Sequence, residues 1–229
     1  MQAVILAAGR GVRMGALTEN IPKPMLLIQG KPLLEWKLEM LPDSIDEVFL
    51  TVGYLGEQIE AYFGNEWKGK KIHYVRHEKL DGTGGSIHLV YQTGLLLDQI
   101  LVLMGDDLYS KNDLGKMLGH NLAVLACEVE DSTQFGVLEI DDTGKLVCIV
   151  ERPHDSLQKL VNTGAYILNK HFFEYPLVAI SDTEFGLPQT LMQMRDTYDI
   201  AVEQTKTWFP IGSPEALEEA QEKIKEFIV

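Results

Sequence analysis

The sequence predicts an α/β fold, and three observations support this. The chain has 229 residues, of which 45% are hydrophobic and 24% charged, so it can bury a sizeable core. Its first half alternates short strand-like runs with helical patterns. Runs such as Ile100–Met104 are apolar throughout, which suits strands that are covered on both faces. We therefore expect a Rossmann-like three-layer α/β/α arrangement around a mixed, mainly parallel central sheet, in one domain of residues 1–229.

The first half, residues 1 to about 110, carries the βαβ pattern. Strands are expected at Ala3–Ala8, Glu47–Val52, Lys71–Arg76 and Ile100–Met104. Helices are expected at Leu33–Leu41, Gly56–Phe63 and Gly84–Leu97. Because crossover connections make such strands parallel, their carboxyl ends should meet at one edge of the sheet, where ligands bind in this fold class.

The second half, from about residue 111, is expected to be mixed or antiparallel. Closely spaced strand candidates occupy Leu122–Val129, Phe135–Ile140, Lys145–Val150 and Asn162–Leu168, with a turn at Asp142-Thr143-Gly144. A closing helix is expected after Ser213, a suitable N-cap, with Pro214 at its first position. Its apolar stripe consists of Leu217, Ala220, Ile224, Phe227 and Ile228. The stripe is expected to dock on the domain; a helix that binds a partner is the alternative.

Composition excludes several classes of partner. The formal net charge is −14, so the surface repels nucleic acid and anionic membranes. Any phosphate site must then be a local concentration of basic groups and backbone N–H donors. Cys127 and Cys148 lie in apolar, strand-like runs and are expected to be buried thiols rather than zinc ligands or catalytic groups.

The chain is expected to be cytoplasmic. No run approaches the ~18–20 apolar residues of a membrane span. The N-terminal apolar stretch lacks the basic start of a signal peptide and runs directly into a glycine-rich loop. The sequence specifies no oligomeric state, and a homo-oligomer is compatible with it.

The loop after the first strand is the first candidate for chemistry. It reads Leu6-Ala7-Ala8-Gly9-Arg10-Gly11-Val12-Arg13-Met14-Gly15, and its small residues let backbone N–H groups approach a ligand. Arg10, Arg13 and Lys23 favour an anion pocket, although a solvated loop is the alternative. The dinucleotide pattern G-x-G-x-x-G fails at its third position and the P-loop pattern is absent, which disfavours a nicotinamide-dependent oxidoreductase.

This loop resembles the signature of a known family. Leu6-Ala7-Ala8-Gly9-x-Gly11-x-Arg13-Met14, then Leu17-Thr18 and Pro22-Lys23-Pro24-Met25, is similar to the triphosphate-binding loop of the sugar-nucleotide pyrophosphorylases. The resemblance, to the short single-domain type, implies the nucleotide-diphospho-sugar transferase fold. It also implies nucleotide contacts at Leu6, Ala7, Ala8, Gly9 and Gly11. Arg13 would hold the departing pyrophosphate and Lys23 the α-phosphate and the attacking phosphate, since fixed cations stabilise charge that shifts among phosphate oxygens.

A second motif, Met104-Gly105-Asp106-Asp107, directly follows a predicted strand. Carboxylates in this place suit Mg²⁺, a hard ion that prefers oxygen ligands, although a turn or a helix cap is the alternative. The motif resembles the Gly-Asp pair whose aspartate binds the catalytic metal in the family. The resemblance implies Asp106, rather than Asp107, as the ligand of a Mg²⁺ cofactor.

The segment Leu80-Asp81-Gly82-Thr83-Gly84-Gly85-Ser86 resembles the family segment that faces the nucleobase and then begins a helix. Gly82 and Thr83 are the implied nucleotide contacts. Many uridylyl- and thymidylyltransferases have a glutamine five residues before that glycine, where this chain has His77. His77 either contacts the base or is a plain surface histidine, so the base stays open.

Three downstream elements resemble the sugar-binding side of the family: Phe135-Gly136-Val137, Glu151-Arg152-Pro153 and Asn162-Thr163-Gly164-Ala165-Tyr166. They imply sugar-phosphate contacts at Gly136, Glu151, Arg152 and Asn162, with an arginine in place of the family's lysine. Without the resemblance, Glu151-Arg152-Pro153 would be an ordinary charged turn.

One position departs from the family. Trp208-Phe209-Pro210-Ile211-Gly212-Ser213-Pro214 resembles a Trp-x-Asp-x-Gly-Thr-Pro element whose aspartate is the second metal ligand, but this chain has Pro210. Either Asp106 holds Mg²⁺ together with phosphates and waters, or another carboxylate substitutes, or the site is weakened.

The implied reaction transfers NMP from a nucleoside triphosphate to a sugar 1-phosphate, forming an NDP-sugar and pyrophosphate. One alternative is a cytidylyltransferase acting on phosphocholine or another alcohol phosphate, in which Tyr109, Tyr166 and Trp208 would surround a quaternary ammonium group. The other is a catalytically weakened nucleotide-binding regulatory protein, which Pro210 motivates.

Overall fold

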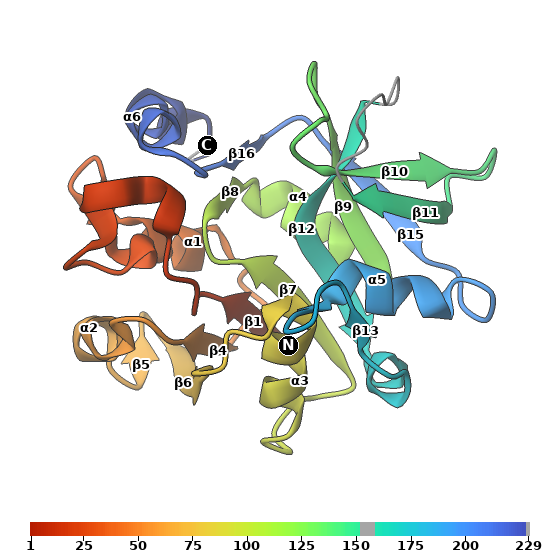
Figure 1. Cartoon of the computed structure of the whole chain (residues 1–229), viewed down its shortest axis with the longest axis horizontal. Helices are drawn as coiled ribbons and strands as arrows, with labels where there is room; N and C mark the ends of the chain where they lie inside the picture. Colours follow the sequence, from red (N-terminus) through yellow and green to blue (C-terminus); the bar gives the residue numbers. More distant parts are fainter. Residues whose placement is uncertain (152–158, 228–229) are drawn as a thin grey trace.

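A single mixed sheet forms the centre of the molecule. The computed structural model describes residues 1–151 and 159–227. Within these residues a ten-stranded sheet has the order β11-β10-β12-β7-β1-β4-β6-β5; β9 pairs with β12, and β15 pairs with β9 (Figure 1). The strands are β1 (Gln2–Leu6), β4 (Glu47–Val52), β5 (Glu66–Trp67), β6 (Lys70–Arg76), β7 (Gln99–Met104), β9 (Ala123–Glu128), β10 (Gly136–Ile140), β11 (Leu146–Glu151), β12 (Leu160–Asn169) and β15 (Ala201–Thr205).

The N-terminal half of the sheet is parallel. β1 lies between β4 and β7 and runs parallel to both, with Leu6 opposite Thr51 and Met104. β6 is also parallel to β4, whereas β12 is antiparallel to β7 and β10 is antiparallel to β11. The predicted change from parallel to antiparallel pairing is therefore confirmed. The carboxyl ends of β1, β4 and β7 meet at one edge of the sheet.

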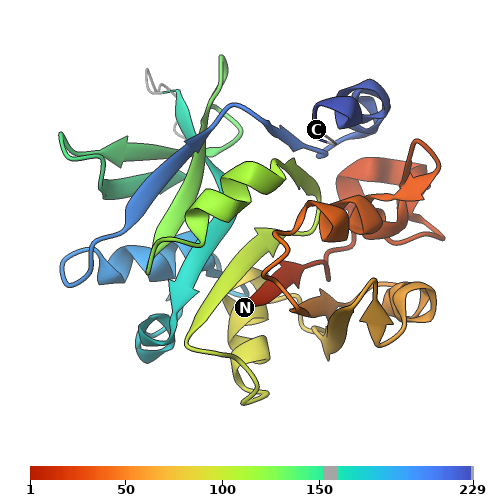
Figure 2. The ribbon, with the colours of Figure 1, turned by 180° about the vertical axis from the view of Figure 1, so that it is seen from behind.

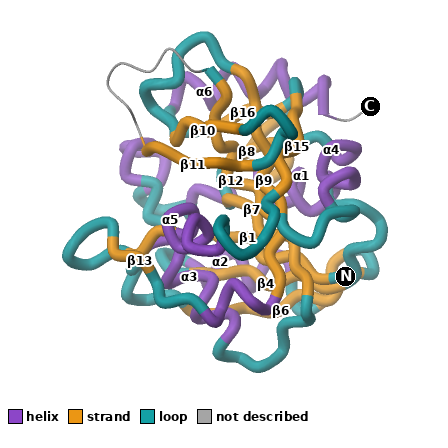
Figure 3. Tube along the Cα trace, turned by 90° about the vertical axis from the view of Figure 1, so that its right-hand side faces the viewer, coloured by secondary structure: helices purple, strands orange, loops and turns teal. Residues whose placement is uncertain are grey.

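Helices cover both faces of this sheet, which confirms the three layers (Figures 1 and 2). One face carries α1 (Leu33–Met40), α2 (Gly56–Phe63) and α4 (Lys111–Met117); the other carries α3 (Gly82–Tyr91) and α5 (Leu187–Leu191). Seen edge-on in Figure 3, α4 lies on one side of the strands and α3 and α5 on the other.

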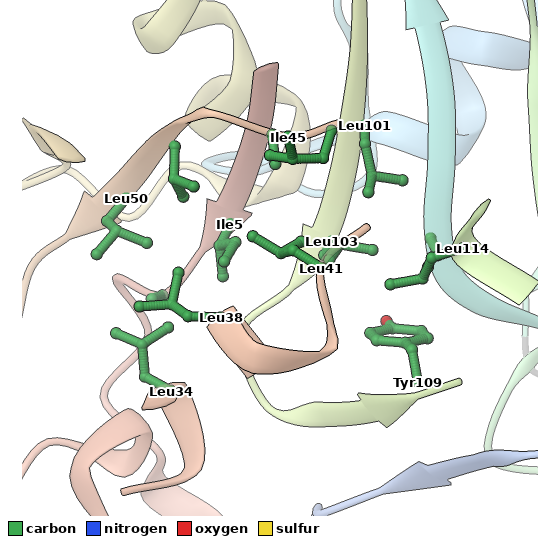
Figure 4. Close-up of a cluster of buried hydrophobic side chains, with 14 of the residues drawn as sticks. Ile5, Leu34, Leu38, Leu41, Ile45, Leu50, Leu101, Leu103, Tyr109 and Leu114 are labelled. Atoms are coloured by element: carbon green, nitrogen blue, oxygen red, sulfur yellow. The ribbon is translucent and has the colours of Figure 1, made fainter. Parts of the chain in front are cut away.

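Successive side chains of each central strand pack on opposite faces of the sheet. Ile5 of β1 packs with Leu34 and Leu38 of α1 on one face (Figure 4), while the neighbouring Val4 packs with Ile87 of α3 on the other face. All of these side chains are fully buried. Burial on both faces explains why these strands are apolar at every position rather than at every second one.

The predicted helix Gly84–Leu97 is wrong at both ends, since α3 spans Gly82–Tyr91. Gly94 has a φ of 70°, a left-handed conformation that stops the helix. The apolar residues Leu95 and Leu97 beyond it are more than half exposed and belong to a loop. Their hydrophobic side chains continued the helical pattern in the sequence, and that pattern does not show where the backbone leaves the helix.

The closing helix α6 (Pro214–Lys223) docks on the domain as expected. The Ser213 side chain accepts a hydrogen bond from the backbone N–H of Ala216 at 3.3 Å, so it is the N-cap. Ala220, Ile224 and Phe227 of the stripe are buried. They form a cluster with residues of α1 and of the short ribbon β8 (Asp107–Tyr109) and β16 (Trp208–Pro210). Ile228 lies outside the described residues.

The remaining elements are short. They are η1 (Val12–Thr18), η2 (Lys23–Met25), β2 (Leu27–Ile28), β3 (Lys31–Pro32), η3 (Lys170–Glu174), β13 (Val178–Ala179), β14 (Phe185–Gly186), η4 (Met192–Met194) and η5 (Ile224–Phe227). Both cysteines are free thiols, but only Cys127 is buried; Cys148 lies half-buried on the edge strand β11, which corrects its prediction. In the described part of the chain, no helix has the length and apolar character needed to cross a membrane.

Candidate active site

The ends of the three central parallel strands are tied together at the edge of the sheet. The backbone N–H of Gly105 donates to the Leu6 carbonyl at 2.9 Å. The N–H of Ala7 donates to the carbonyl of Thr51 at 3.1 Å and lies 3.2 Å from the Thr51 hydroxyl. These bonds fix the start of the glycine-rich loop against the segment that carries Asp106.

A hollow opens at this edge and brings together most of the predicted phosphate-side residues. Its wall includes Leu6, Ala7, Gly9, Gly11, Arg13, Lys23 and Asp106. Ala8 does not line it, because Ala8 is buried with its carbonyl against Gly53. Arg10 does not line it either, since its guanidinium lies over the Tyr54 ring, 5.2 Å from the centroid. Two of the three predicted cations therefore face the hollow.

Lys23 and Asp106 face each other in the hollow. Lys23 Nζ lies 2.5 Å from Asp106 Oδ2, and the two side chains are 8% and 36% exposed. A β-carbon at Gly11 would lie 3.0 Å from Cβ of Lys23, and Gly11 has a φ of 63°. Glycine at position 11 therefore lets the loop cover the lysine stem while the ammonium stays at the wall of the hollow.

Arg13 reaches the hollow from η1. Its guanidinium lies 3.5 Å from where a β-carbon on Gly212 would stand, and its side chain is exposed. Gly212 lies between β16 and α6, so the arginine spans the space between the glycine-rich loop and the segment before α6. An exposed guanidinium at such a place can bind a phosphate bidentately.

The residues at the hollow fit a Mg²⁺ ion bound by one protein carboxylate. Mg²⁺ is commonly held by one or two carboxylates plus substrate phosphates and keeps several waters. The Asp106 carboxylate faces the hollow, whereas Asp107 is buried and accepts a hydrogen bond from Trp208 Nε1 at 3.0 Å. Pro210 offers no ligand, and residues 1–151 and 159–227 contain no group of three or more His, Cys, Asp or Glu side chains suited to a metal.

The predicted base-side residues His77, Gly82 and Thr83 do not line the hollow. His77 is only 5% exposed and its Nε2 lies 2.7 Å from Asp81 Oδ1, so the surface reading of His77 is wrong. Its carbonyl lies 3.2 Å from a β-carbon position on Gly53. Gly82 has a φ of 87° and faces the Phe185 carbonyl at 2.4 Å from its β-carbon position, which excludes any side chain.

Thr83 is part of the same contact. Its hydroxyl accepts a hydrogen bond from the backbone N–H of Leu187 at 3.0 Å. This hydrogen bond joins the N-terminus of α3 to the start of α5, two segments that lie about a hundred residues apart in the sequence.

The predicted sugar-side residues lie on the antiparallel half of the sheet. Gly136 and Glu151 face each other across β10 and β11, and Glu151 Oε1 lies 3.0 Å from a β-carbon position on Gly136. Asn162 of β12 donates to the Tyr166 hydroxyl at 2.6 Å and accepts from the N–H of Gly164 at 3.0 Å. Arg152 lies outside the described residues.

A bulge in β12 packs against the end of β7. Its register shifts between Asn162 and Tyr166, and Gly164 has a φ of 77°. A β-carbon on Gly164 would lie 2.4 Å from Cγ of Met104, two residues before Asp106. The sugar-side strand is therefore packed directly against the end of β7.

Comparison with known proteins assigns the family. The model of the family described as "Nucleotidyl transferase" matches residues 2–226. The chain belongs to the nucleotidyl transferase family. This confirms the resemblance drawn from the glycine-rich loop.

The relatives of this nucleotidyl transferase carry sugar-nucleotide names. It is 37% identical over 174 residues to the bifunctional protein GlmU of Methanocaldococcus jannaschii, covering 76% of this chain and 41% of that protein. It is 33% identical over 224 residues to GlmU of Methanococcus vannielii, covering 93% and 52%. The chain thus spans about half the length of these curated relatives. It is also 29% identical over 238 residues to the UTP–glucose-1-phosphate uridylyltransferase AglF of Haloferax volcanii, covering 99% and 97%.

Solved structures confirm the fold. A UDP-glucose pyrophosphorylase complexed with UDP-glucose superposes with a TM-score of 0.81 at 23% identity, covering 98% of both chains. A putative glucose-1-phosphate thymidylyltransferase from Bacillus anthracis superposes with a TM-score of 0.86 at 20% identity, covering 99% of this chain and 96% of that one.

The nucleotidyl transferase also has site-adjacent residues that the sequence analysis missed. Lys37 of α1 is 1% exposed and its Nζ donates to the Asp107 carbonyl. Asp81 holds His77, and Trp208 holds Asp107. A signal for Lys37 was present, because it falls on the apolar face of its helix between Leu34 and Leu38. The contacts of Asp81 and Trp208 depend on tertiary packing and have no such sequence signal.

Proposed function

We propose that this nucleotidyl transferase moves NMP from a nucleoside triphosphate to a sugar 1-phosphate and releases pyrophosphate. The observation that supports it most is the hollow in which Lys23, Arg13 and Asp106 converge at the carboxyl ends of β1 and β7. Two cations gathered in a chain of net charge −14 suit a polyanionic substrate. The sugar-nucleotide names of the relatives agree with this chemistry.

The proposed step is a direct in-line displacement. A phosphate oxygen of the sugar 1-phosphate forms a bond to the α-phosphorus, and the bond from that phosphorus to the bridging oxygen of the β-phosphate breaks. The electron pair leaves with pyrophosphate, so no covalent enzyme intermediate is required. Catalysis then consists of positioning and charge neutralisation.

In the proposal, each residue of the hollow has a separate role in positioning the phosphates or neutralising their charge. Lys23 exchanges the Asp106 carboxylate for the α-phosphate and the attacking phosphate, and Arg13 holds the departing pyrophosphate. Asp106 would hold Mg²⁺, which would neutralise phosphate charge when bound. The backbone of Leu6, Ala7, Gly9 and Gly11, which lines the hollow, would contact the triphosphate, whereas Ala8 would not.

The remaining contacts of the proposal surround the base and the sugar. His77, Gly82 and Thr83 would border the nucleobase. Gly136, Glu151, Arg152 and Asn162 would bind the sugar phosphate. The Asn162 side chain is already held by Tyr166 and by the N–H of Gly164, so it would present its free lone pair and N–H to a sugar hydroxyl without rearranging.

The test is a panel of triphosphates against sugar 1-phosphates, with pyrophosphate release as the readout, in Mg²⁺ and after removal of Mg²⁺ by a chelator. At least one pair should release pyrophosphate, and the chelator should abolish the release. Tight nucleotide binding with no release from any pair would instead support a regulatory nucleotide-binding protein, the alternative that Pro210 favours.

The phosphocholine alternative loses its structural support. Tyr109 and Tyr166 are 1% and 2% exposed, so neither ring can border a bound quaternary ammonium group. The Tyr109 hydroxyl donates to the Thr163 carbonyl at 2.8 Å, and the Tyr166 hydroxyl accepts from Asn162. Both rings belong to the core rather than to a binding cage.

A further inference from the structure

A buried lysine that the proposed reaction does not use lies directly behind Asp106. The side chain of Lys37 enters the core from α1, and its Nζ lies 4.4 Å from the centroid of the Tyr109 ring. Taking an ammonium group out of water is costly unless its charge and donors are compensated. An apolar residue would fill the same place on the helix at no such cost, so the lysine calls for a functional reason.

Strand pairing explains what the ammonium contacts. The N–H of Ile211 donates to the Asp106 carbonyl at 3.1 Å, so the next pair, Pro210 and Asp107, is a non-hydrogen-bonded pair of the β8–β16 ribbon. The Asp107 carbonyl therefore points to the edge of β8 away from β16, into the core. Lys37 Nζ donates to it there. A buried carbonyl without a donor would be destabilising, so Lys37 fixes the backbone immediately after Asp106.

The charge of Lys37 acts on the same segment. Burial lowers the pKa of Lys37, while the negative charges of Asp107 and Asp106 raise that pKa in part. Asp106 pairs with Lys23 at the hollow, and the carbonyl of the next residue, Asp107, accepts a hydrogen bond from Lys37 in the core. Since Pro210 supplies no second carboxylate, the orientation of the single carboxylate Asp106 has to be set by such contacts rather than by a shared metal ligand.

We propose that Lys37 is a positioning residue for nucleotidyl transfer. By holding the Asp107 carbonyl, its ammonium keeps the Gly105–Asp107 turn in the conformation in which the Asp106 carboxylate faces the hollow. The proposal rests on the proposed function and adds to it a residue that touches neither substrate.

The test begins with the intact protein and the most active substrate pair of the panel. Lys37→Met removes the charge and the donor but keeps an unbranched apolar chain that matches the lysine stem as far as its ε-carbon. We expect kcat to fall about tenfold or more, because small displacements of a reacting group are costly. The Mg²⁺ concentration that gives half the maximal rate should rise at least about threefold, while KM for the triphosphate stays within about twofold.

Lys31→Met is the matched control. Lys31 precedes the same helix, lies 3.6 Å from the centroid of the Trp36 ring and pairs with Glu39 at 2.5 Å, outside the hollow. Its kcat and Mg²⁺ dependence should equal those of the wild type. A purely structural loss would lower the thermal midpoint of Lys37→Met without moving the half-saturating Mg²⁺ concentration, and that result would overturn the proposal.

A double-mutant cycle tests whether Lys37 acts through Asp106. Asp106→Asn combined with Lys37→Met should be no slower than Asp106→Asn alone, because the positioned carboxylate is already gone. Additive losses would overturn the proposal.

If Lys37→Met does not fold, Lys37→Gln, which is uncharged and one bond too short for the carbonyl, takes its place. Failure of both variants to fold would assign Lys37 to stability alone. A wild type that releases no pyrophosphate would overturn the proposed function, whereas an active wild type with an unchanged Lys37→Met would overturn only the positioning role.

Discussion

Lys23 has a carboxylate partner in the structure and would need a different one in the proposed reaction. Its Nζ lies 2.5 Å from Asp106 Oδ2, at the wall of a hollow that Arg13 also lines. In the proposed reaction, a triphosphate that entered this hollow would compete with Asp106 for the ammonium, and the released carboxylate would then be free to hold Mg²⁺. The ion pair satisfies both groups in the structure, and the proposal requires that phosphate separate them.

Replacement of Lys23 tests that assignment. Lys23→Ala should lower kcat by about 10²–10³, the scale for losing one group that stabilises the transition state. Arg10→Ala is the control, since Arg10 belongs to the same loop but lies over Tyr54. The kcat of Arg10→Ala should match that of the wild type. Steady-state pyrophosphate release measures both, and near-normal turnover of Lys23→Ala would remove the lysine from the mechanism.

Gly105 makes the close contact that holds Asp106 beside the glycine-rich loop. A β-carbon there would lie 2.5 Å from the Leu6 carbonyl oxygen and 3.0 Å from Cα of Ala7, both backbone atoms that cannot yield cheaply. Gly105→Ala should therefore lower the free energy of unfolding by about 1–3 kcal/mol.

Gly115 in α4 serves as the control, because a β-carbon on it meets nothing within 4 Å. Gly115→Ala should raise the free energy of unfolding by about 0.5–1 kcal/mol, since alanine favours a helix. Urea unfolding of the two variants measures both changes. Equal stability of Gly105→Ala and the wild type would show that the strand ends are not packed as described.

At the scale of elements, one charged contact joins three strands at the edge where the parallel strands begin. Glu47 of β4 contacts Gln2 of β1 and His73 of β6, the latter at 2.6 Å. The hydrogen bond from Gln2, then that from His73, lowers the pKa of Glu47 to about 2 from its ordinary value of 4.5. A lowered carboxyl pKa stabilises the fold above pH 4.5, and that contribution is lost as the pH falls from 4.5 to about 2.

Glu47→Gln should therefore be less stable than the wild type at pH 6 by roughly 1–2 kcal/mol, after allowance for partial exposure of the side chain. The difference should shrink steadily below pH 4.5 and vanish near pH 2. Glu66→Gln, which changes an exposed residue of the short strand β5, serves as the matched control. Urea midpoints measured from pH 6 to pH 2 would test this, and a difference that persisted at pH 2 would contradict it.

Elements with strong local patterns were predictable, and elements set by partners were not. The strand Glu47–Val52 and the helix Gly56–Phe63 match their predicted bounds, because each has an apolar pattern of fitting period and clear flanking signals. β15 (Ala201–Thr205) was missed, since its identity as a strand depends on pairing with β9 more than seventy residues earlier. The same holds for β8 and β16, which have three residues each and form strands only by pairing with each other.

At the scale of the whole molecule, most of the predicted phosphate-side residues come together in one hollow, whereas the predicted base-side residues and the described sugar-side residues do not line it. Arg13, Lys23 and Asp106 line one hollow because each follows or faces the carboxyl end of a parallel strand. The topology of a parallel sheet places these strand ends at one edge. His77 was left open between base contact and surface residue, because its burial depends on Asp81 and on the packing of Gly53. The role of each residue in the site stays a prediction.

The two halves of the chain should unfold as one unit. β7 of the first half pairs with β12 of the second along five residues, from Leu103 opposite Ala165 to Gln99 opposite Asn169. The core cluster on the α1 face also combines residues from both halves, such as Ile5 and Ile167. Separating the halves would expose this apolar surface, so an intermediate with one half folded is unfavourable.

Tryptophan fluorescence can test this prediction, because Trp67 lies in the first half and Trp208 in the second. Variants in which Trp36 is also replaced, so that Trp67 or Trp208 is the single tryptophan, should show urea midpoints that coincide with each other and with the far-ultraviolet circular dichroism of the same variant. Thermal unfolding should likewise give one calorimetric transition. A lower midpoint at Trp208 than at Trp67 would mean that the sugar-side half opens independently. The continuous sheet would then join two separate folding units, contrary to a single domain spanning residues 1–229.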